Sequence, residues 1–447
     1  MYDILYRNHF ECIEFIGNFR PFSTQQIYPT MASPTYDGSD VTEQNLDLYY
    51  SNLFPSDPLF QWTSYGDKER KQCAKREYSI TVASPANPDG VFVRYQRCET
   101  VQDFQKLMKR ERRGTEPEWV AKLDIGPIYN GDVSRHKETR LECEEKELVF
   151  DIDMDAYDDV RTCCKEKKVC RYCFKFLTAA AKVIDRSLRE DFDFKHILFV
   201  FSGRRGIHCW VNDYKARSLS NSGREAVAAY LSLETAKKDS EGRVLERALM
   251  HPVFQRAAEL LKDDFPKLFA KQHIFNTRAS RMKLVETHFT EPALVLRSYK
   301  PDNSADDEDS WEDLLNGKNT DTTGVQRAIL HYLYPRLDIE VSKQMNHLLK
   351  APFCVHPKTG RVCVPLDVRT IDEFNPDTVP TLGQLISELY QLARKNGDDI
   401  RTLNKITRDD KVKDTSLGPY VEFFTSYVKN CLADERKRRG NTKAELF

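Results

Sequence analysis

The chain has 447 residues, with 68 lysines and arginines against 69 aspartates and glutamates, so its net charge is close to zero. At ~150 residues per domain, this length predicts two or three folding units, each able to bury a core. Charged residues make up 31% and hydrophobic residues 40% of the chain, which excludes a disordered or fibrous protein. The balance of charge also excludes binding of nucleic acid through bulk positive charge, and it leaves local patches as the place to search.

The ends and the cysteines indicate a compartment. No apolar run approaches the ~18–20 residues that span a bilayer, and the N-terminus lacks the basic and apolar regions of a signal peptide, so no membrane association is expected. Residues 1–42 are predicted to be a separable extension, disordered or misassigned, with Met31 as an alternative start. The twelve cysteines are too scattered for a disulfide scaffold, which favours a reducing compartment such as the cytosol or the nucleus.

The first predicted elements are a helix and a hairpin. Apolar residues recur on one face of residues 46–53, which predicts a helix. Residues 78–82 and 91–95 alternate as strands do, and the segment between them is rich in turn-forming residues. We therefore expect a β-hairpin, with Glu77 just before its first strand and Arg94 on its second.

A pair of carboxylates follows on the next predicted strand. Alternation places Leu148 and Phe150 on one face and Asp151 and Asp153 on the other. Two adjacent carboxylates repel each other unless a cation lies between them, and oxygen ligands suit Mg²⁺ or Mn²⁺. An acidic strand end exposed to water explains such a pair equally well when it stands alone.

Four cysteines lie within eleven residues of one another: Cys163, Cys164, Cys170 and Cys173. Four sulfur ligands suit tetrahedral Zn²⁺, and because all four positions would be taken by protein the site would be closed and structural. The adjacent pair is atypical, so an iron–sulfur cluster or free thiols remain alternatives. Residues 174–190, directly after the cluster, are predicted to be a helix.

A basic hairpin comes next. Residues 197–201 and 207–211 are predicted to be strands joined by a glycine-flanked turn. Glycine lets backbone N–H groups approach phosphate, and arginine binds phosphate through two hydrogen bonds. A solvated hairpin tip with incidental bases is the alternative. The candidate phosphate ligands are Ser202, Gly203, Arg204, Arg205 and His208.

A third carboxylate lies further along. Residues 223–270 are predicted to be helical, and residues 302–313 carry seven acids and no base, which indicates a solvated loop. Strand-like alternation resumes near Leu333 and sets Asp338 on the face opposite its apolar neighbours. Two aspartates on one strand and a third on a distant strand form a frame for two-metal phosphoryl transfer. The sequence alone leaves open whether Asp338 meets Asp151.

A second basic segment follows the third carboxylate. Lys350 and His356 are placed on a strand before a Lys-Thr-Gly turn, and His347 stands just upstream. By itself, such a pattern belongs more often to an ordinary protein surface than to a functional site. Its position shortly after Asp338 suits neutralisation of triphosphate charge. The four bases of residues 436–439 mark a C-terminal tail.

Taken together, these segments resemble the catalytic small subunit of the archaeal–eukaryotic DNA primases. The resemblance is carried, in order, by KREYSITV, VFVRYQR, ELVFDIDMDAYDDVR, the cysteine cluster, FSGRRGIHCWV, YPRLDIEVSK and NHLLKAPFCVHPKTGR. It implies a mixed α/β "prim" fold, in which two sheets form a cleft and a helical subdomain and a small zinc motif are inserted. The implied segments are an extension (1–42), a first catalytic part (43–213) with the zinc motif (163–173), a helical insertion with an acidic loop (214–325), a second catalytic part (326–400) and a helical C-terminal segment with the basic tail (401–447).

The resemblance also implies an activity: DNA-directed synthesis of short RNA primers from ribonucleoside triphosphates by two-metal nucleotidyl transfer, in the nucleus. Implied partners are a large primase subunit, the DNA polymerase α complex and single-stranded template DNA. Implied cofactors are two Mg²⁺ or Mn²⁺ ions and a structural Zn²⁺. A non-catalytic, zinc-stabilised DNA-binding or scaffold subunit and a primase-polymerase for repair or bypass are the competing hypotheses.

Residue roles follow from the same resemblance. Asp151, Asp153 and Asp338 match the catalytic metal ligands, and the four clustered cysteines match the zinc ligands. The matched nucleotide-binding residues are Glu77, Arg94, Ser202, Gly203, Arg204, Arg205, His208, His347, Lys350 and His356. For Glu77 and Arg94, ordinary surface charge in a hairpin is the alternative.

Overall fold

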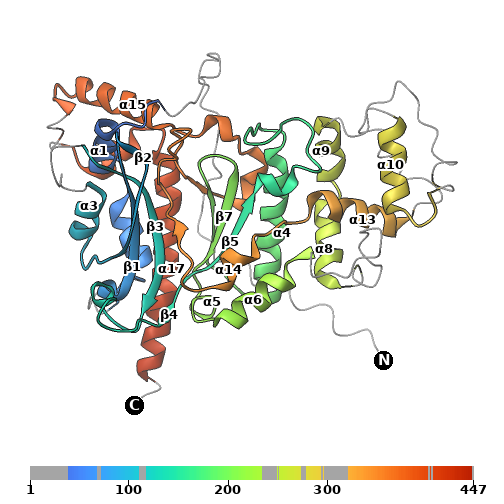
Figure 1. The fold of residues 1–447 in the computed structure, drawn as a ribbon, viewed down its shortest axis with the longest axis horizontal. Helices are drawn as coiled ribbons and strands as arrows, with labels where there is room; N and C mark the ends of the chain where they lie inside the picture. Colours follow the sequence, from blue (N-terminus) through green and yellow to red (C-terminus); the bar gives the residue numbers. More distant parts are fainter. Residues whose placement is uncertain are drawn as a thin grey trace. The chain divides into compact units, whose positions relative to one another are not determined.

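The computed structural model describes residues 39–67, 72–109, 117–233, 249, 251–272, 278–292, 295, 321–400, 403 and 406–444 (Figure 1). The predicted extension lies outside these residues up to residue 38, and so do the acidic stretch 302–313 and residues 234–248 of the predicted helical segment. All described residues belong to one unit, residues 35–447, and the predicted internal boundaries stay predictions. None of the described helices combines the length and the apolarity that a membrane crossing needs.

Two antiparallel sheets form the centre, as the sequence predicts. The first has the order β2-β1-β3-β4, with β8 also paired to β3, and the second has the order β5-β7-β6-β9. The strands of the first sheet are β1 (Arg76–Ser84), β2 (Asn87–Gln96), β3 (Trp119–Tyr129), β4 (Cys143–Glu145) and β8 (Leu349–Lys350). Those of the second are β5 (Leu148–Asp153), β6 (Ile197–Phe201), β7 (Gly206–Val211) and β9 (Pro365–Leu366). Both predicted hairpins, β1–β2 and β6–β7, are confirmed.

Helices pack around both sheets. Beside the first sheet, α1 contacts β3 and α15, and beside the second, α4 contacts β5 and β7. α8 contacts both α4 and α13, so the helical insertion is attached to the second sheet through α4 (Figure 1). The helices are α1 (Glu43–Asn52), α2 (Ser56–Thr63), α3 (Val101–Lys109), α4 (Phe174–Phe192), α5 (Tyr214–Arg217), α6 (Asn221–Tyr230), α8 (Pro252–Leu261), α9 (Asp264–Gln272), α10 (Arg278–His288), α13 (Thr322–Leu333), α14 (Ile339–Lys343), α15 (Leu382–Lys395), α16 (Arg408–Lys413) and α17 (Gly418–Ala444).

Short 3₁₀ helices connect these elements. They are η1 (Cys73–Lys75), η2 (Val133–Arg135), η3 (Met154–Tyr157), η5 (Val368–Glu373) and η6 (Pro376–Thr378). The predicted helices at 46–53 and 174–190 correspond to α1 and α4. Thr42 begins α1 by accepting a hydrogen bond from the backbone N–H of Asn45 at 3.2 Å, which satisfies one of the free donors at the start of the helix.

The strand predicted near Leu333 and around Asp338 is wrong. α13 continues to Leu333, and α14 begins directly after Asp338. The Asp338 carboxylate accepts a hydrogen bond from the backbone N–H of Glu340 at 3.1 Å and so caps α14. A helix-capping aspartate offers the backbone a local partner, and here that capping outweighs the apolar alternation on which the strand prediction relied.

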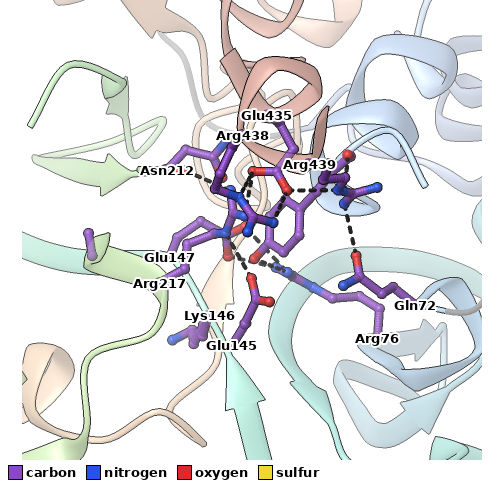
Figure 2. A network of polar contacts seen from close by, with 12 residues as sticks. Gln72, Arg76, Glu145, Lys146, Glu147, Asn212, Arg217, Glu435, Arg438 and Arg439 are labelled. Carbon is purple, nitrogen blue, oxygen red and sulfur yellow. Dashed lines mark hydrogen bonds and ion pairs between the residues drawn. The ribbon is translucent and has the colours of Figure 1, made fainter. Parts of the chain in front are cut away.

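A buried network of ionic groups joins the two sheets to the C-terminal helix (Figure 2). Arg76 at the start of β1 forms a fully buried pair with Glu147, just before β5, at 2.7 Å. Arg217 bridges Glu145 and Glu435 of α17 at 3.0 Å each. Burial alone would raise the pKa of Glu147, but Arg76 outweighs it and holds that pKa below its ordinary value. The network therefore fixes the entry to β5 against the first sheet.

Candidate active site

The three predicted carboxylates lie together. Asp151 and Asp153 stand on β5, opposite His208 and Gly206 of β7. The backbone N–H of Asp338 donates a hydrogen bond to the carbonyl of Asp151 at 3.1 Å, which places the start of α14 against β5. The predicted meeting of the distant carboxylate with the strand pair therefore occurs, although a helix start and not a strand supplies it.

The negative charges of the three carboxylates repel one another. Burial, followed by the charges of Asp153 and Asp338, raises the pKa of Asp151 to about 7. Asp153 is paired with Arg205 at 3.1 Å, and His208 Nε2 lies 3.7 Å from Asp151. A divalent cation would relieve the repulsion, and three carboxylates supply the hard oxygen ligands that Mg²⁺ and Mn²⁺ prefer. The chemistry of the donor set therefore fits such ions.

The turn between β6 and β7 has the geometry of an anion-binding loop. Ser202 and Gly206 close it, because the N–H of Gly206 donates to Ser202 Oγ and the N–H of Ser202 donates to the Gly206 carbonyl, both at 2.9 Å. Gly203 has φ +85°, and a Cβ there would lie 2.7 Å from Cβ of His356. Only glycine fits this position without strain. Arg204 makes no ion pair with any residue that the structure describes.

The second basic segment docks onto this turn. Lys350 Nζ donates to the carbonyl of Ser202 at 2.6 Å, and Thr359 Oγ1 donates to the carbonyl of Gly203 at 2.7 Å. Lys350 lies on β8 as predicted, but the strand ends at Lys350, so the prediction that His356 shares it is wrong: His356 stands directly before the turn at residues 357–359. The structure therefore brings the two basic segments together beside the carboxylates.

Both histidines of this cluster are neutral near pH 7. Burial, followed by the charges of Lys350 and Lys122, lowers the pKa of His208 to about 3. Burial, followed by the charges of Lys350 and Arg204, lowers the pKa of His356 to about 3. The Nδ1 atom of His208 is buried and has no hydrogen-bond partner in the part of the chain that the structure describes. A neutral imidazole donates a single N–H, so the positive charge for a phosphate would come from lysine and arginine.

Three other predicted nucleotide ligands are placed differently. Glu77 and Arg94 bind each other, with Arg94 Nε 2.8 Å from Glu77 Oε1, and Tyr129 donates a further hydrogen bond to Glu77. Among the described residues, no hydrogen bond or ion pair joins this couple to the carboxylates or to the turn. The imidazole of His347 lies at the protein surface, and partial burial, followed by the charge of Lys146, lowers its pKa below the ordinary value, although Asp338 and Asp124 act in the opposite direction.

Sequence reasoning missed Asp124 on β3. Asp124 is 1% exposed, lies opposite Lys350 in the β3–β8 register, and neither carboxylate oxygen has a hydrogen-bond partner of good geometry. Lys122 Nζ lies 3.0 Å from Oδ1. Burial raises the pKa of Asp124. Among the described residues, Lys122 is therefore the ion-pair partner of this buried carboxylate, which lies beside Lys350. The signal in the sequence was an acid two residues after a lysine in a mostly apolar strand.

The four clustered cysteines also converge. Their sulfur atoms all lie within 4.8 Å of one another, and among the described residues they form the group already spaced to hold a metal ion. Gln272 at the end of α9 donates from Nε2 to Cys163 Sγ at 3.1 Å and accepts from the N–H of Thr162 at 2.8 Å. The cluster could therefore bind zinc, with α9 fastened to its loop.

Comparisons with known proteins agree with this geometry. A family model described as "DNA primase small subunit" matches residues 150–368. The DNA primase small subunit of Drosophila melanogaster is 37% identical over 87% of this chain and 91% of its own length. Those of Schizosaccharomyces pombe and Saccharomyces cerevisiae are each 34% identical, over 92% and 90% of this chain and 96% and 95% of their own lengths.

Among the solved structures that match is "Polymerase Domain from Mycobacterium tuberculosis Ligase D in complex with DNA", which covers 82% of this chain and 99% of its own, at 12% identity and a TM-score of 0.33. That likeness is too remote to bear on the assignment. The relatives of high identity span almost the whole chain, and the family model covers the residues that carry all three carboxylates and both basic segments. The chain belongs to the DNA primase small-subunit family.

Proposed function

We propose that this chain makes short RNA primers on a DNA template by two-metal nucleotidyl transfer at the carboxylates Asp151, Asp153 and Asp338. The observation that carries the proposal is the hydrogen bond between the Asp338 N–H and the Asp151 carbonyl, because it brings the third carboxylate to the other two. The bound ions would lower the pKa of the attacking 3′-hydroxyl and neutralise the leaving pyrophosphate. The three aspartates would hold these ions.

The basic cluster would hold the triphosphate. Arg205 now pairs with Asp153 and Asp155, and occupation of the carboxylates by metal would leave its guanidinium available to phosphate. Arg204, Lys350, His208 and His356 stand around the same turn, and Ser202 and Gly203 remain proposed nucleotide contacts whose carbonyls accept hydrogen bonds from Lys350 and Thr359 in this fold. Glu77, Arg94 and His347 remain proposed nucleotide contacts that would need a change of partner or position on binding.

Lys350→Met tests the triphosphate site. Loss of one charge-assisted hydrogen bond costs about 1.5–3 kcal/mol, so KM for ATP should rise about 10–100-fold with a smaller change in kcat. Lys358→Met is the matched control, because Lys358 is exposed in the following turn and should leave KM unchanged. Initial rates against ATP concentration give both constants. Equal KM values for the two variants would remove Lys350 from the site.

Product analysis on a poly(dT) template with Mg²⁺ or Mn²⁺ tests the reaction itself. We expect ATP to be joined into short RNA without a primer, and dATP to be joined poorly. Efficient dATP incorporation would favour a primase-polymerase of repair or bypass. No product with either substrate, alone or with a large subunit, would favour a DNA-binding or scaffold subunit.

We also propose that the four cysteines hold a structural Zn²⁺, because their sulfurs converge and all four are protein ligands. Cys173→Ala should remove about one zinc per chain, measured by mass spectrometry of the native protein, and should lower the melting temperature, because metal binding is coupled to folding. Cys143→Ser, outside the cluster and only partly buried, is the control. Wild-type zinc content in Cys173→Ala would overturn the ligand assignment.

Partners and location belong to the same proposal. The relatives are named small subunits, which supports a larger partner subunit for this chain. We propose that the chain acts in the nucleus with a large primase subunit and the DNA polymerase α complex on single-stranded DNA.

A further inference from the structure

A second cavity lies away from the carboxylates, against the loop of the four cysteines. Its volume is about 730 Å³. Its walls are the end of the cysteine loop with the first turns of α4, the helix α9, Leu333 at the end of α13, and the chain from η5 to Asn375. Cavities of roughly 300–1,000 Å³ accept ligands the size of a nucleotide. None of the residues placed in the catalytic site lines it.

The charges that line this cavity leave an excess of unpaired cations. Three acids line it. Asp264 and Asp372 are both paired with Lys182, which lies outside the lining, at 2.8 Å in the case of Asp372, and Glu373 forms no ion pair with any described residue. The lining bases Arg171, Lys267 and Lys271 also form no ion pair with any described residue. Lys267 and Lys271 stand one turn apart on α9, so both face the same opening. An anion is therefore the complementary ligand.

Aromatic side chains stand beside these cations. Tyr172 carries the Arg171 guanidinium over its ring at 4.8 Å, and Arg171 Nη2 donates to the Tyr172 hydroxyl at 2.7 Å. Phe374 is held by Phe174 and Phe201, with ring centroids 5.1 and 5.6 Å away. Aromatic rings next to unpaired cations are the combination that binds single-stranded nucleic acid, because bases stack on the rings and phosphates meet the cations.

The wall of the cavity continues into the second basic segment of the active site. From Asn375 the chain enters η6, where Asp377 accepts a hydrogen bond from Arg361 at 2.9 Å. The Arg361 carbonyl in turn accepts a hydrogen bond from the N–H of His356 at 2.8 Å. These hydrogen bonds therefore link the wall of the cavity to the segment that carries the groups proposed to bind the triphosphate.

We propose that this cavity is a second nucleic-acid site, which binds one base of single-stranded DNA and the phosphates on either side of it, outside the catalytic centre. Tyr172 and Phe374 take the base, and Arg171, Lys267 and Lys271 take the phosphates. The choice of a strand over a free nucleotide rests on the family assignment, since a primase must hold its template.

The test measures the binding of a fluorescein-labelled oligo(dT) to the full chain. Fluorescence anisotropy gives the binding constant at several salt concentrations from 25 mM upward. Lys267→Glu/Lys271→Glu should weaken binding at least 10-fold at low salt. The slope of log K against log salt should fall by about 1.4, that is ~0.7 for each of two lost phosphate contacts. Lys262→Glu/Lys283→Glu, two exposed lysines on the same group of helices but outside the cavity, is the matched control and should change both quantities little.

Two further arms make the result decisive. Tyr172→Ala should weaken oligo(dT) binding about 10-fold with little change in salt slope, because it removes stacking and no charge. KM for ATP in primer synthesis should stay at its wild-type value in all these variants. Equal weakening by the cavity pair and the control pair would overturn the proposal, as would wild-type binding too weak to detect at 25 mM salt. Loss of metal-free ATP binding without loss of oligo(dT) binding would assign the cavity to a free nucleotide and reject the strand.

Discussion

Asp151→Asn should reduce primer synthesis by about 10³-fold or more, a loss of ~4 kcal/mol of transition-state stabilisation. Asn keeps the shape of the side chain but removes the negative charge that binds the ions. Burial and the neighbouring carboxylates raise the pKa of Asp151 to about 7, so its charge is unfavourable in the metal-free fold. The measurement is dinucleotide formation on poly(dT) with Mg²⁺, together with the melting temperature in EDTA.

The direction of the stability change separates loss of chemistry from loss of fold. A carboxylate whose pKa is raised on folding destabilises the fold above its ordinary pKa, fully so above pH 7. Asp151→Asn should therefore melt no earlier than the wild type at pH 8 in EDTA, and it should gain less stability from added Mg²⁺. Glu340→Gln, an exposed carboxylate two residues from Asp338, should retain wild-type activity. An Asp151→Asn protein that is folded and fully active would refute the proposed site.

Glu147→Ala should cost about 3–5 kcal/mol of folding free energy, because it leaves the Arg76 guanidinium buried without its counter-ion. Both side chains are fully buried, and Arg76 Nη2 lies 2.7 Å from Glu147 Oε2. Without Glu147, the side-chain hydrogen-bond partner left to Arg76 among the described residues is the Tyr65 hydroxyl at 2.9 Å. Denaturant unfolding of the two proteins measures the difference. Since Glu147 leads directly into β5, some loss of activity should accompany the loss of stability.

Two comparisons test the reason for this cost. Glu144→Ala breaks the nearby surface pair Lys75–Glu144, at 3.3 Å with 32% and 48% of the side chains exposed, and should cost at most about 1 kcal/mol. The double variant Arg76→Met/Glu147→Leu removes both charges and should be less destabilised than Glu147→Ala alone. If the double variant lost as much stability as the single one, an uncompensated charge would not be the cause.

Local patterns account for the parts of the fold and of the site that lie within a few residues of one another. Alternation predicted the strand that carries Asp151 and Asp153, glycine placement predicted the β6–β7 turn, and spacing predicted the cysteine cluster. These features depend on strand periodicity, turn conformation and short chain separations, which are written directly in the order of residues. The same periodicity failed at Asp338, where a helix cap and a strand have similar local signals.

The sequence by itself therefore determined which chemical groups are available to the site, and its motifs determined which protein family the chain resembles. What only the tertiary structure decided is which of these groups meet. Packing of α14 against β5 brings Asp338 to Asp151, and pairing of β8 with β3 lets Lys350 reach Ser202 and places it beside Asp124. Packing also brings α4, α9 and the segment after η5 together around the cavity. Such contacts join segments far apart in the chain, and they arise from burial of the shared core rather than from any local pattern.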